Sequence, residues 1–282
     1  MKQYSFNQDK PTLYLVPTPI GNKSDITNRS IEILNSVDMI ACEDKRVSKK
    51  LLDTLDIHKP LMVNQKFNED ENIDSFMQLL DEGKSIALIS DAGMPCISDP
   101  GYTVVYQLVN KGYTVVPLPG ANAALTALMA SGIDSNRFTF IGFLPASKSA
   151  REKELESLKD KQETLIFYEA VHRIDEMLAS MLNVFGDRNV CVARELTKLH
   201  ETLYRGKLSE VIAELDIKGE YVIVVEGNKE VSDNGVSIDV NKCIQLLLDE
   251  GVSVKSASKI AATLTGMNKN QCYAIASQLH KN

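Results

Sequence analysis

The chain has 282 residues, of which 44% are hydrophobic and 24% are charged, and its formal net charge is −7. That length is sufficient for two domains with hydrophobic cores of their own. No apolar run approaches the roughly 20 residues that span a bilayer, and the polar first residues contain no apolar signal-peptide core. Composition therefore argues against a membrane protein and predicts a cytoplasmic one.

Short apolar runs alternate with helical patterns from residue 13 to residue 119. Strands are expected at Leu13–Val16, Met39–Ala41, Leu61–Val63, Ile86–Ile89 and Thr114–Val116. Helices are expected around Ile31–Val37, Val47–Leu55, Ile73–Glu82 and Thr103–Asn110. Such alternation is typical of a largely parallel α/β sheet.

A second α/β unit is expected after a helix of small residues at Asn122–Ala130. Its strands are predicted at Phe138–Phe143, Thr164–Tyr168, Asn189–Ala193 and Tyr221–Val225. Three short helices with helix-turn-helix-like spacing are predicted at Val240–Asp249, Ser256–Leu264 and Lys269–Leu279. We therefore predict α/β domains at residues 1–119 and 120–228, a polar linker at 229–238 and a C-terminal helical module at 239–282.

Five widely spaced cysteines and four scattered histidines show no spacing that is typical of a disulfide framework or a zinc site. The sequence therefore predicts no metal.

Loops rich in proline and glycine follow three predicted strands, at residues 17–22, 90–101 and 117–124. Proline fixes φ and glycine permits positive φ, so these loops have specified backbone shapes.

Ligands of open α/β sheets bind beyond the carboxyl ends of the strands, where these three loops are predicted to lie. Each loop alone also fits a turn that only ends a strand. No Gly-x-Gly-x-x-Gly sequence follows any strand, which argues against a dinucleotide-binding Rossmann site. A small ligand bound between two domains is therefore favoured.

The three loops belong to a series of motifs that extends through most of the chain. The N-terminal motifs are Pro17-Thr18-Pro19-Ile20-Gly21-Asn22, Asp25-Ile26-Thr27, Glu43-Asp44 with Arg46, Ser90-Asp91-Ala92-Gly93 with Pro95, Asp99-Pro100-Gly101 and Leu118-Pro119-Gly120. The later motifs are Phe140-Ile141-Gly142-Phe143-Leu144-Pro145, Thr164-Leu165-Ile166-Phe167-Tyr168-Glu169, His172-Arg173, Ala193-Arg194-Glu195-Leu196-Thr197-Lys198 and Val225-Glu226-Gly227. With these motifs the chain resembles the ribosomal RNA small subunit methyltransferase I family, a group of tetrapyrrole-methylase-like, S-adenosylmethionine-dependent enzymes.

The resemblance implies two α/β domains of the tetrapyrrole-methylase type, with the methyl donor bound in the cleft between them, and a small C-terminal helical module. It implies an enzyme that uses S-adenosylmethionine and no metal to methylate the ribose 2′-oxygen of a cytidine. The implied substrate is the decoding region of 16S rRNA in the assembled 30S subunit. The resemblance also implies a homodimer.

Residues that match the family's motifs are candidates for two roles. The cofactor-binding candidates are Pro19, Gly21, Asp91, Ala92, Gly93, Pro95, Pro119, Gly120, Ala121, Tyr168 and Glu169. The catalytic candidates are Glu43, Asp44, Arg46 and Lys198. An acid that accepts the proton of the hydroxyl would assist the transfer, and Asp99 is a further candidate for that role. Each charged residue also fits a surface ion pair or a helix cap.

The chain departs from the family's pattern at Lys23, Lys45, Met94 and Ala121. Met94 stands where threonine is usual and removes a hydroxyl from the central loop. The net charge of −7 has the wrong sign for indiscriminate binding of phosphate, although residues 239–282 alone carry +2.

Two alternatives remain open at this stage. One is a methylase of a tetrapyrrole or another small molecule, and the other is a non-catalytic RNA-binding assembly factor. The C-terminal lysines Lys255, Lys259 and Lys269 fit either RNA contacts or the solvated face of a small helical appendage.

Overall fold

A five-stranded parallel sheet forms the first part of the computed structural model, which describes residues 2–3, 10–65, 69–229 and 239–280. Its strands are β1 (Thr12–Leu15), β2 (Met39–Cys42), β3 (Leu61–Val63), β4 (Ile86–Leu88) and β5 (Thr114–Pro117). They are arranged in the order β3-β2-β4-β1-β5. All five predicted strands are present, each within one residue of its expected bounds.

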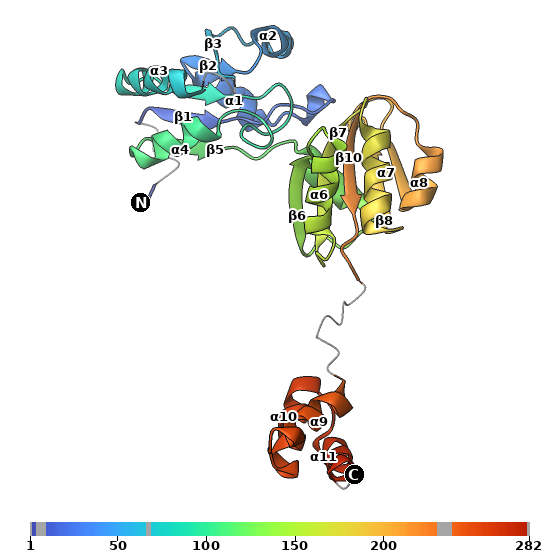
Figure 1. Cartoon of the computed structure of the whole chain (residues 1–282). Helices are drawn as coiled ribbons and strands as arrows, with labels where there is room; N and C mark the ends of the chain where they lie inside the picture. Colours follow the sequence, from blue (N-terminus) through green and yellow to red (C-terminus); the bar gives the residue numbers. More distant parts are fainter. Residues whose placement is uncertain (1, 4–9, 66–68, 230–238, 281–282) are drawn as a thin grey trace. The chain divides into compact units, whose positions relative to one another are not determined.

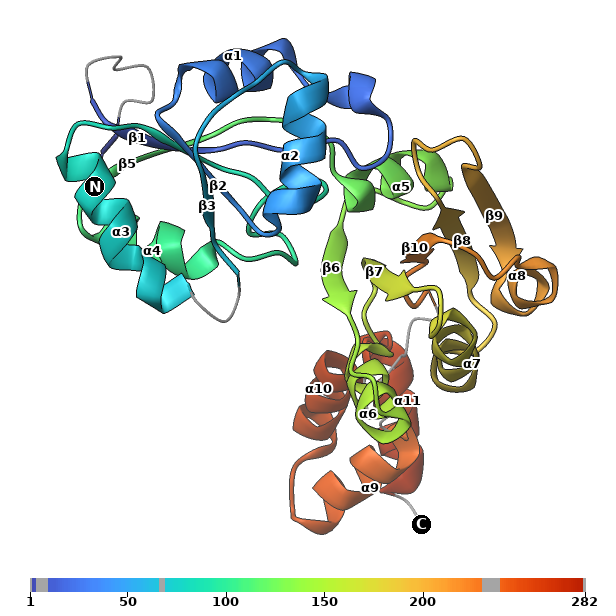
Figure 2. The same cartoon turned by 90° about the horizontal axis from the view of Figure 1, so that it is seen from above.

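Helices cover both faces of this sheet because its strands are apolar on both sides. The helices are α1 (Asn28–Ser36), α2 (Lys45–Thr54), α3 (Glu69–Asp81) and α4 (Tyr102–Asn110), and a short 3-10 helix, η1 (Lys23–Asp25), precedes α1. Leu34 of α1 and Leu52 of α2 pack on one face, and Phe76 of α3 and Leu108 of α4 pack on the other (Figure 2). Helix α3 begins four residues before its predicted start at Ile73, because the apolar pattern on which the prediction rests starts only there.

The second sheet also has five strands, but only one pair is parallel. The strands are β6 (Phe138–Phe143), β7 (Thr164–Ala170), β8 (Asn189–Arg194), β9 (Thr202–Lys207) and β10 (Glu220–Val225), in the order β6-β7-β10-β8-β9. Strands β6 and β7 are parallel, whereas the other neighbours are antiparallel. The prediction missed β9, which lies at the edge of the sheet and carries two cations and a glycine.

Four helices pack on the second sheet. They are α5 (Ala123–Ser131), α6 (Lys148–Leu158), α7 (Ile174–Phe185) and α8 (Leu208–Glu214). Helices α6, α7 and α8 share one core with one face of the sheet, where α6 and α7 are seen in Figure 1. The small residues of α5 pack against the opposite face, which allows the helix to lie close to the strands.

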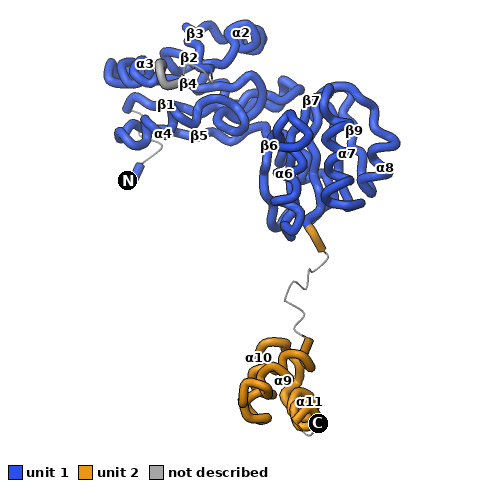
Figure 3. The backbone as a smooth tube through the Cα atoms, in the orientation of Figure 1, with its two compact units in different colours: residues 1–227 blue, residues 228–282 orange. Residues whose placement is uncertain are grey.

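The C-terminal helices α9 (Val240–Asp249), α10 (Val254–Thr265) and α11 (Lys269–Leu279) enclose a small core of their own. Residues 1–227 and 228–282 form two compact units (Figure 3). The predicted boundary after residue 119 stays a prediction, and residues 230–238 of the predicted linker lie outside the described residues. Among the described helices, none has the length and apolarity needed to cross a membrane.

Candidate active site

The loops that follow β1 and β4 are joined at the carboxyl edge of the first sheet. Thr18 and Gly93 form an antiparallel bridge, with N–H to carbonyl distances of 2.9 and 3.1 Å. The Thr18 hydroxyl also donates to the carbonyl of Ser90 at 3.1 Å. The loop after β5 packs tightly against the loop after β1, because a Cβ atom on Gly120 would be 2.5 Å from the Cβ of Pro17.

The strand order explains why these loops frame a crevice. Strands β1 and β4 are parallel neighbours, but β1 leads to α1 on one face of the sheet and β4 leads to α4 on the other. The two connections therefore diverge from adjacent strand ends. Such switch points of open α/β sheets leave a crevice in which ligands bind.

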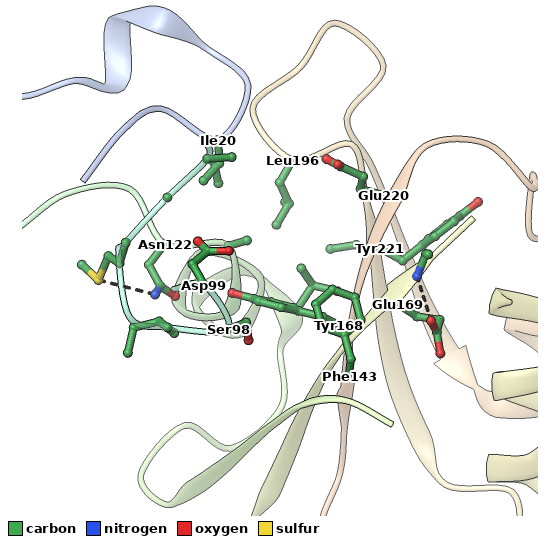
Figure 4. Close-up of a pocket in the computed structure, with 18 of the residues that line it drawn as sticks. Ile20, Ser98, Asp99, Asn122, Phe143, Tyr168, Glu169, Leu196, Glu220 and Tyr221 are labelled. Atoms are coloured by element: carbon green, nitrogen blue, oxygen red, sulfur yellow. Dashed lines mark hydrogen bonds between the residues drawn. The ribbon is translucent and has the colours of Figure 1, made fainter. Parts of the chain in front are cut away.

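A cavity of about 280 Å³ lies between these loops and the second sheet. This volume is near the lower end of the range for small-molecule sites, about 300 to 1,000 Å³. The first sheet's loops contribute Ile20, Ala92, Gly93, Met94, Ile97, Ser98 and Asp99, and α5 contributes Asn122 and Ala123. The second sheet and its loops contribute Phe143, Tyr168, Glu169, Ala170, Ala193, Leu196, Lys198, Glu220, Tyr221 and Val222 (Figure 4).

The loop from Met94 to Gly101 has a strained backbone on the first sheet's side of the cavity. Cys96 and Ser98 adopt φ values of 72° and 66°, which residues with a Cβ atom seldom adopt. The Met94 sulfur lies 3.6 Å from the donating Nδ2 of Asn122. Strain of this kind persists where the surrounding structure imposes it and is frequent at ligand sites.

Tyr168 forms part of the second sheet's wall. Its phenol oxygen accepts a hydrogen bond from the backbone N–H of Ala124 at 3.2 Å, at the start of α5. The rings of Phe140 and Phe143 approach it edge-on, with centroid distances of 5.0 and 5.6 Å. Burial raises the pKa of the Tyr168 phenol, so this group remains a neutral hydrogen-bonding side chain.

Glu169, the next residue, uses its carboxylate within the protein. Its side chain is fully buried, and its Oε1 accepts a hydrogen bond from the N–H of Ala170 at 2.9 Å. Its Oε2 lies 3.3 Å from Nη2 of Arg173, which also donates to the carbonyls of Leu144 and Pro145. The pair therefore ties the end of β7 to the chain that follows β6.

The loop from Glu195 to Lys198 reaches the loop after β1. Glu195 and Thr197 adopt positive φ values, 51° and 65°. The N–H of Asn22 donates to the Thr197 hydroxyl at 2.9 Å, and a Cβ atom on Gly21 would lie 2.5 Å from Cγ of Lys198. This close approach requires glycine and brings the loops of the two sheets into direct contact.

Lys198 is held by two carboxylates at the cavity. Its Nζ donates to Glu195 at 2.9 Å and to Glu220 at 2.8 Å. Burial lowers the pKa of the Lys198 ammonium, but the hydrogen bonds that it donates to Glu220 and Glu195 outweigh burial and raise that pKa above its ordinary value. Lys198 is therefore a fixed cation at neutral pH.

The candidate acids separate into two environments. Burial raises the pKa of Glu43 and Asp91, and the charge of Asp91 adds to the effect on Glu43. Burial and the charge of Glu43 raise the pKa of Asp99 to about 6. Asp44 differs, because hydrogen bonds from Arg46 lower its pKa to about 2 and its side chain caps α2.

Asp44 and Asp91 join the two loops that carry these acids, since the N–H of Asp44 donates to Asp91 Oδ1 at 3.2 Å. Of the predicted site residues, Ala92, Gly93, Tyr168, Glu169 and Lys198 line the cavity, as does the further candidate acid Asp99. Those outside its lining are Pro19, Gly21, Glu43, Asp44, Arg46, Asp91, Pro95, Pro119, Gly120 and Ala121.

Pro19 and Gly21 flank the lining residue Ile20, and Ala121 precedes the lining residue Asn122. These three residues therefore affect the cavity through the backbone shape that they impose on its lining residues, rather than through their own side chains. The prediction did not select Phe143, Leu196, Tyr221 or Val222. Phe143 and Leu196 belong to the motifs at 140–145 and 193–198, whereas Tyr221 and Val222 carry no local signal, because they face the cavity through pairing of β10 with strands that are distant in the sequence.

Gly120 offers a direct test of how closely the loops are packed. Gly120→Ala is expected to lower the free energy of unfolding by about 1 to 3 kcal/mol, because the new methyl group would overlap the rigid ring of Pro17. Urea unfolding monitored by circular dichroism measures this change. If overlap is the cause, the loss caused by Gly120→Ala should be smaller in a Pro17→Gly background, which lacks the opposing ring, than in the unmodified protein. Equal losses in the two backgrounds would contradict steric overlap at Gly120.

Comparison with known proteins identifies the class to which this fold belongs. The family model described as Tetrapyrrole (Corrin/Porphyrin) Methylases matches residues 12–212, and the one described as RsmI C-terminal HTH domain matches residues 234–280. Uroporphyrin-III-C-methyltransferase from Thermus thermophilus is 17% identical, with a TM-score of 0.56 over 77% of this chain and 94% of that one. Diphthine synthase is 16% identical, with a TM-score of 0.59 over 77% and 90% of the two chains. The predicted fold class, that of the tetrapyrrole methylases with a C-terminal helical region, is confirmed.

Closer relatives narrow the assignment. Ribosomal RNA small subunit methyltransferase I of Bacillus subtilis (strain 168) is 46% identical, over 96% of this chain and 97% of the relative. The protein of the same name from Escherichia coli O157:H7 is 42% identical over 98% of both chains. The chain belongs to the ribosomal RNA small subunit methyltransferase I family, which confirms the resemblance seen in the sequence.

S-adenosylmethionine, the methyl donor that the family implies, fits the chemistry of this cavity. The donor carries a sulfonium and an ammonium, and the cavity is lined by Asp99, whose carboxylate is coupled to those of Glu43 and Asp91 behind the lining; none of the three forms an ion pair with a described residue. A bound cation would favour their charged forms. Ile20, Leu196 and other apolar side chains provide the complementary wall for the uncharged parts of the donor.

Proposed function

We propose that this protein transfers a methyl group from S-adenosylmethionine to the ribose 2′-oxygen of a cytidine in the decoding region of 16S rRNA, on the assembled 30S subunit. The proposal includes a cytoplasmic homodimer as the acting form. The main support is the likeness to rRNA small subunit methyltransferases over nearly the full chain, including the C-terminal helical unit. The acidic, loop-framed cavity provides a place for the cationic donor.

The donor supplies a methyl group that is already activated by its positively charged sulfur. The protein's main task is then to align the ribose hydroxyl with that carbon, which contributes about 7 to 11 kcal/mol in favourable cases. The loops at Thr18, Gly93 and Gly21 are suited to this task because they are held together by backbone pairing and close approach.

The ribose hydroxyl loses its proton as its oxygen bonds to the methyl carbon and the carbon–sulfur bond breaks. We assign the acceptance of this proton to the acidic group that contains Glu43 and Asp99. Both are carboxylates that no described cation neutralises, and a base of this kind contributes about 10²- to 10⁴-fold in rate. We assign Lys198 the role of holding the Glu195 loop against Gly21.

Labelled S-adenosylmethionine and 30S particles from cells that lack this protein provide the test. Label at a ribose 2′-oxygen of a 16S cytidine is expected, and its absence would overturn the proposal. Incubation with protein-free 16S rRNA tests the requirement for the assembled particle. Label in an added porphyrin instead would support a small-molecule methylase, and no heat of donor binding in calorimetry would support a non-catalytic RNA-binding factor.

Arg46 is expected to serve the RNA rather than the donor. Its side chain is 88% exposed, and its guanidinium forms an ion pair with Asp44 at 2.7 Å. Arg46→Ala is expected to lower kcat/KM for 30S particles by about tenfold, because a charge-assisted contact with the RNA is lost. The dissociation constant for the donor should change less than about twofold. A parallel loss of donor affinity in calorimetry would contradict this division of roles.

A further inference from the structure

Helix α2 carries an unusual concentration of positive charge. Residues 45–59 contain four lysines, one arginine and two acids, a net charge of +3 in a chain whose net charge is −7. Lys45, Lys49 and Lys50 are exposed, and none of them forms an ion pair with another residue in the described part of the chain. Their charges are therefore available to an external partner.

This charge pattern is unfavourable for the helix itself. Lys45 and Lys49, and likewise Arg46 and Lys50, are four residues apart, where like charges repel each other. Lys45 and Arg46 also lie in the first turn of this ten-residue helix, where the helix dipole disfavours positive charge. Local rules that are broken without a local gain are typical of functional surfaces.

An open cavity of about 390 Å³ lies at the other end of the helix. Its lining includes three basic side chains, those of Lys49, His58 and Lys59. It also includes three apolar side chains, those of Leu52, Ile57 and Leu61. Asp53 also lines it, while Asp56 is engaged with His58 Nε2 at 3.0 Å. The cavity extends the positive surface of the helix past its last residue.

The positive surface begins at the candidate active site. Asp44, which caps the helix, receives the side-chain hydrogen bonds of Arg46 and donates its own N–H to Asp91. Ten residues of α-helix extend about 15 Å. The cations of α2 thus form a row that leads from the acidic group of the site to the 390 Å³ cavity. Helix α2 itself packs beside α1 on one face of the first sheet (Figure 2).

We propose that Lys45, Lys49, Lys50 and Lys59 form a phosphate-binding track that holds the RNA backbone leading to or from the target ribose. This inference rests on the proposed function and names the surface that recognises the RNA. A row of flexible ammonium groups without partners matches a row of phosphates and reads no bases. It accounts for RNA binding by a chain whose overall charge is negative.

The test is a triple variant, Lys49→Gln, Lys50→Gln and Lys59→Gln, assayed with 30S particles and with protein-free 16S rRNA. At about 0.15 M salt, KM for the particle is expected to rise at least tenfold while kcat and the donor's dissociation constant are unchanged. The slope of log affinity against log salt should fall by about 2, close to 0.7–0.9 for each lost phosphate contact. Thermal unfolding should occur at the same temperature or higher, because like charges have been removed.

The matched control is the triple variant Lys10→Gln, Lys111→Gln and Lys153→Gln, which removes three exposed lysines from other parts of the same unit. It should retain the KM and the salt slope of the unmodified protein. Equal effects of the two triple variants would overturn the track, and so would a loss of affinity for the particle with none for protein-free rRNA, which would indicate a protein partner. A failure of the unmodified protein to methylate rRNA would instead contradict the proposed function.

Discussion

Asp99→Asn is expected to weaken the binding of S-adenosylmethionine and to remove most of the pH dependence of that binding. Asp99 lines the cavity, and burial with the nearby charge of Glu43 raises its pKa to about 6. A positively charged donor binds the ionised carboxylate better than the protonated acid. Loss of this charge is expected to raise the dissociation constant at pH 7 by about tenfold, which corresponds to roughly 1.4 kcal/mol.

The direction of the pH effect follows from the raised pKa. With a pKa of about 6, Asp99 is mostly protonated at pH 5 and mostly ionised at pH 7. Donor affinity should therefore increase as the pH rises from 5 to 7, by about five- to tenfold if binding lowers this pKa by one or two units. Titration calorimetry at several pH values measures the trend.

Two comparisons identify the group that is responsible. The Asp99→Asn variant should bind the donor with an affinity that varies little between pH 5 and 7. S-adenosylhomocysteine lacks the sulfonium charge, so the unmodified protein should bind it with a smaller pH dependence. An affinity for S-adenosylmethionine that is the same at pH 5 and pH 7 in the unmodified protein would contradict the role of Asp99.

Arg173→Ala is expected to cause the largest loss of stability, about 3 to 5 kcal/mol in the free energy of unfolding. The substitution leaves the fully buried carboxylate of Glu169 without its cation and removes two hydrogen bonds to the carbonyls of Leu144 and Pro145. An uncompensated buried charge is more costly than the loss of the pair as a whole. Urea unfolding of the full chain measures the change.

The double variant Glu169→Gln with Arg173→Met provides the control for this mechanism. It removes both charges, so it should recover a large part of the stability that Arg173→Ala alone loses. Arg46→Ala, which breaks an exposed pair, should change the stability far less than Arg173→Ala does. A double variant that is as unstable as Arg173→Ala would show that the lost hydrogen bonds, and not the buried charge, dominate.

Much of the fold was predictable because its signals are local. The parallel strands of the first sheet are continuous apolar runs such as Ile86–Leu88, and their loops contain the prolines and glycines that their backbone shapes require. Strand β9 was not predictable in the same way. It lies at an edge, its pattern is interrupted by Arg205 and Gly206, and it is stabilised by pairing with β8.

The candidate site was predictable only in part for a related reason. Gly93 and Tyr168 belong to motifs that lie next to strand ends, so the sequence alone points to them. Tyr221 and Val222 of β10 reach the cavity because β10 inserts between β7 and β8 in antiparallel pairing. That order depends on contacts between distant segments, and no short window of sequence contains it.

The sequence by itself determined the family, the alternation of strands and helices, and the places where the backbone must turn, because these depend on the chemistry of neighbouring residues. The tertiary structure alone decided which of these turns lie together and form the cavity. Only folding brings Thr18 against Gly93, Gly21 against Lys198 and the charge of Glu43 near Asp99. The physical reason is that burial and electrostatic coupling depend on distance in space, whereas turn and strand preferences depend on position along the chain.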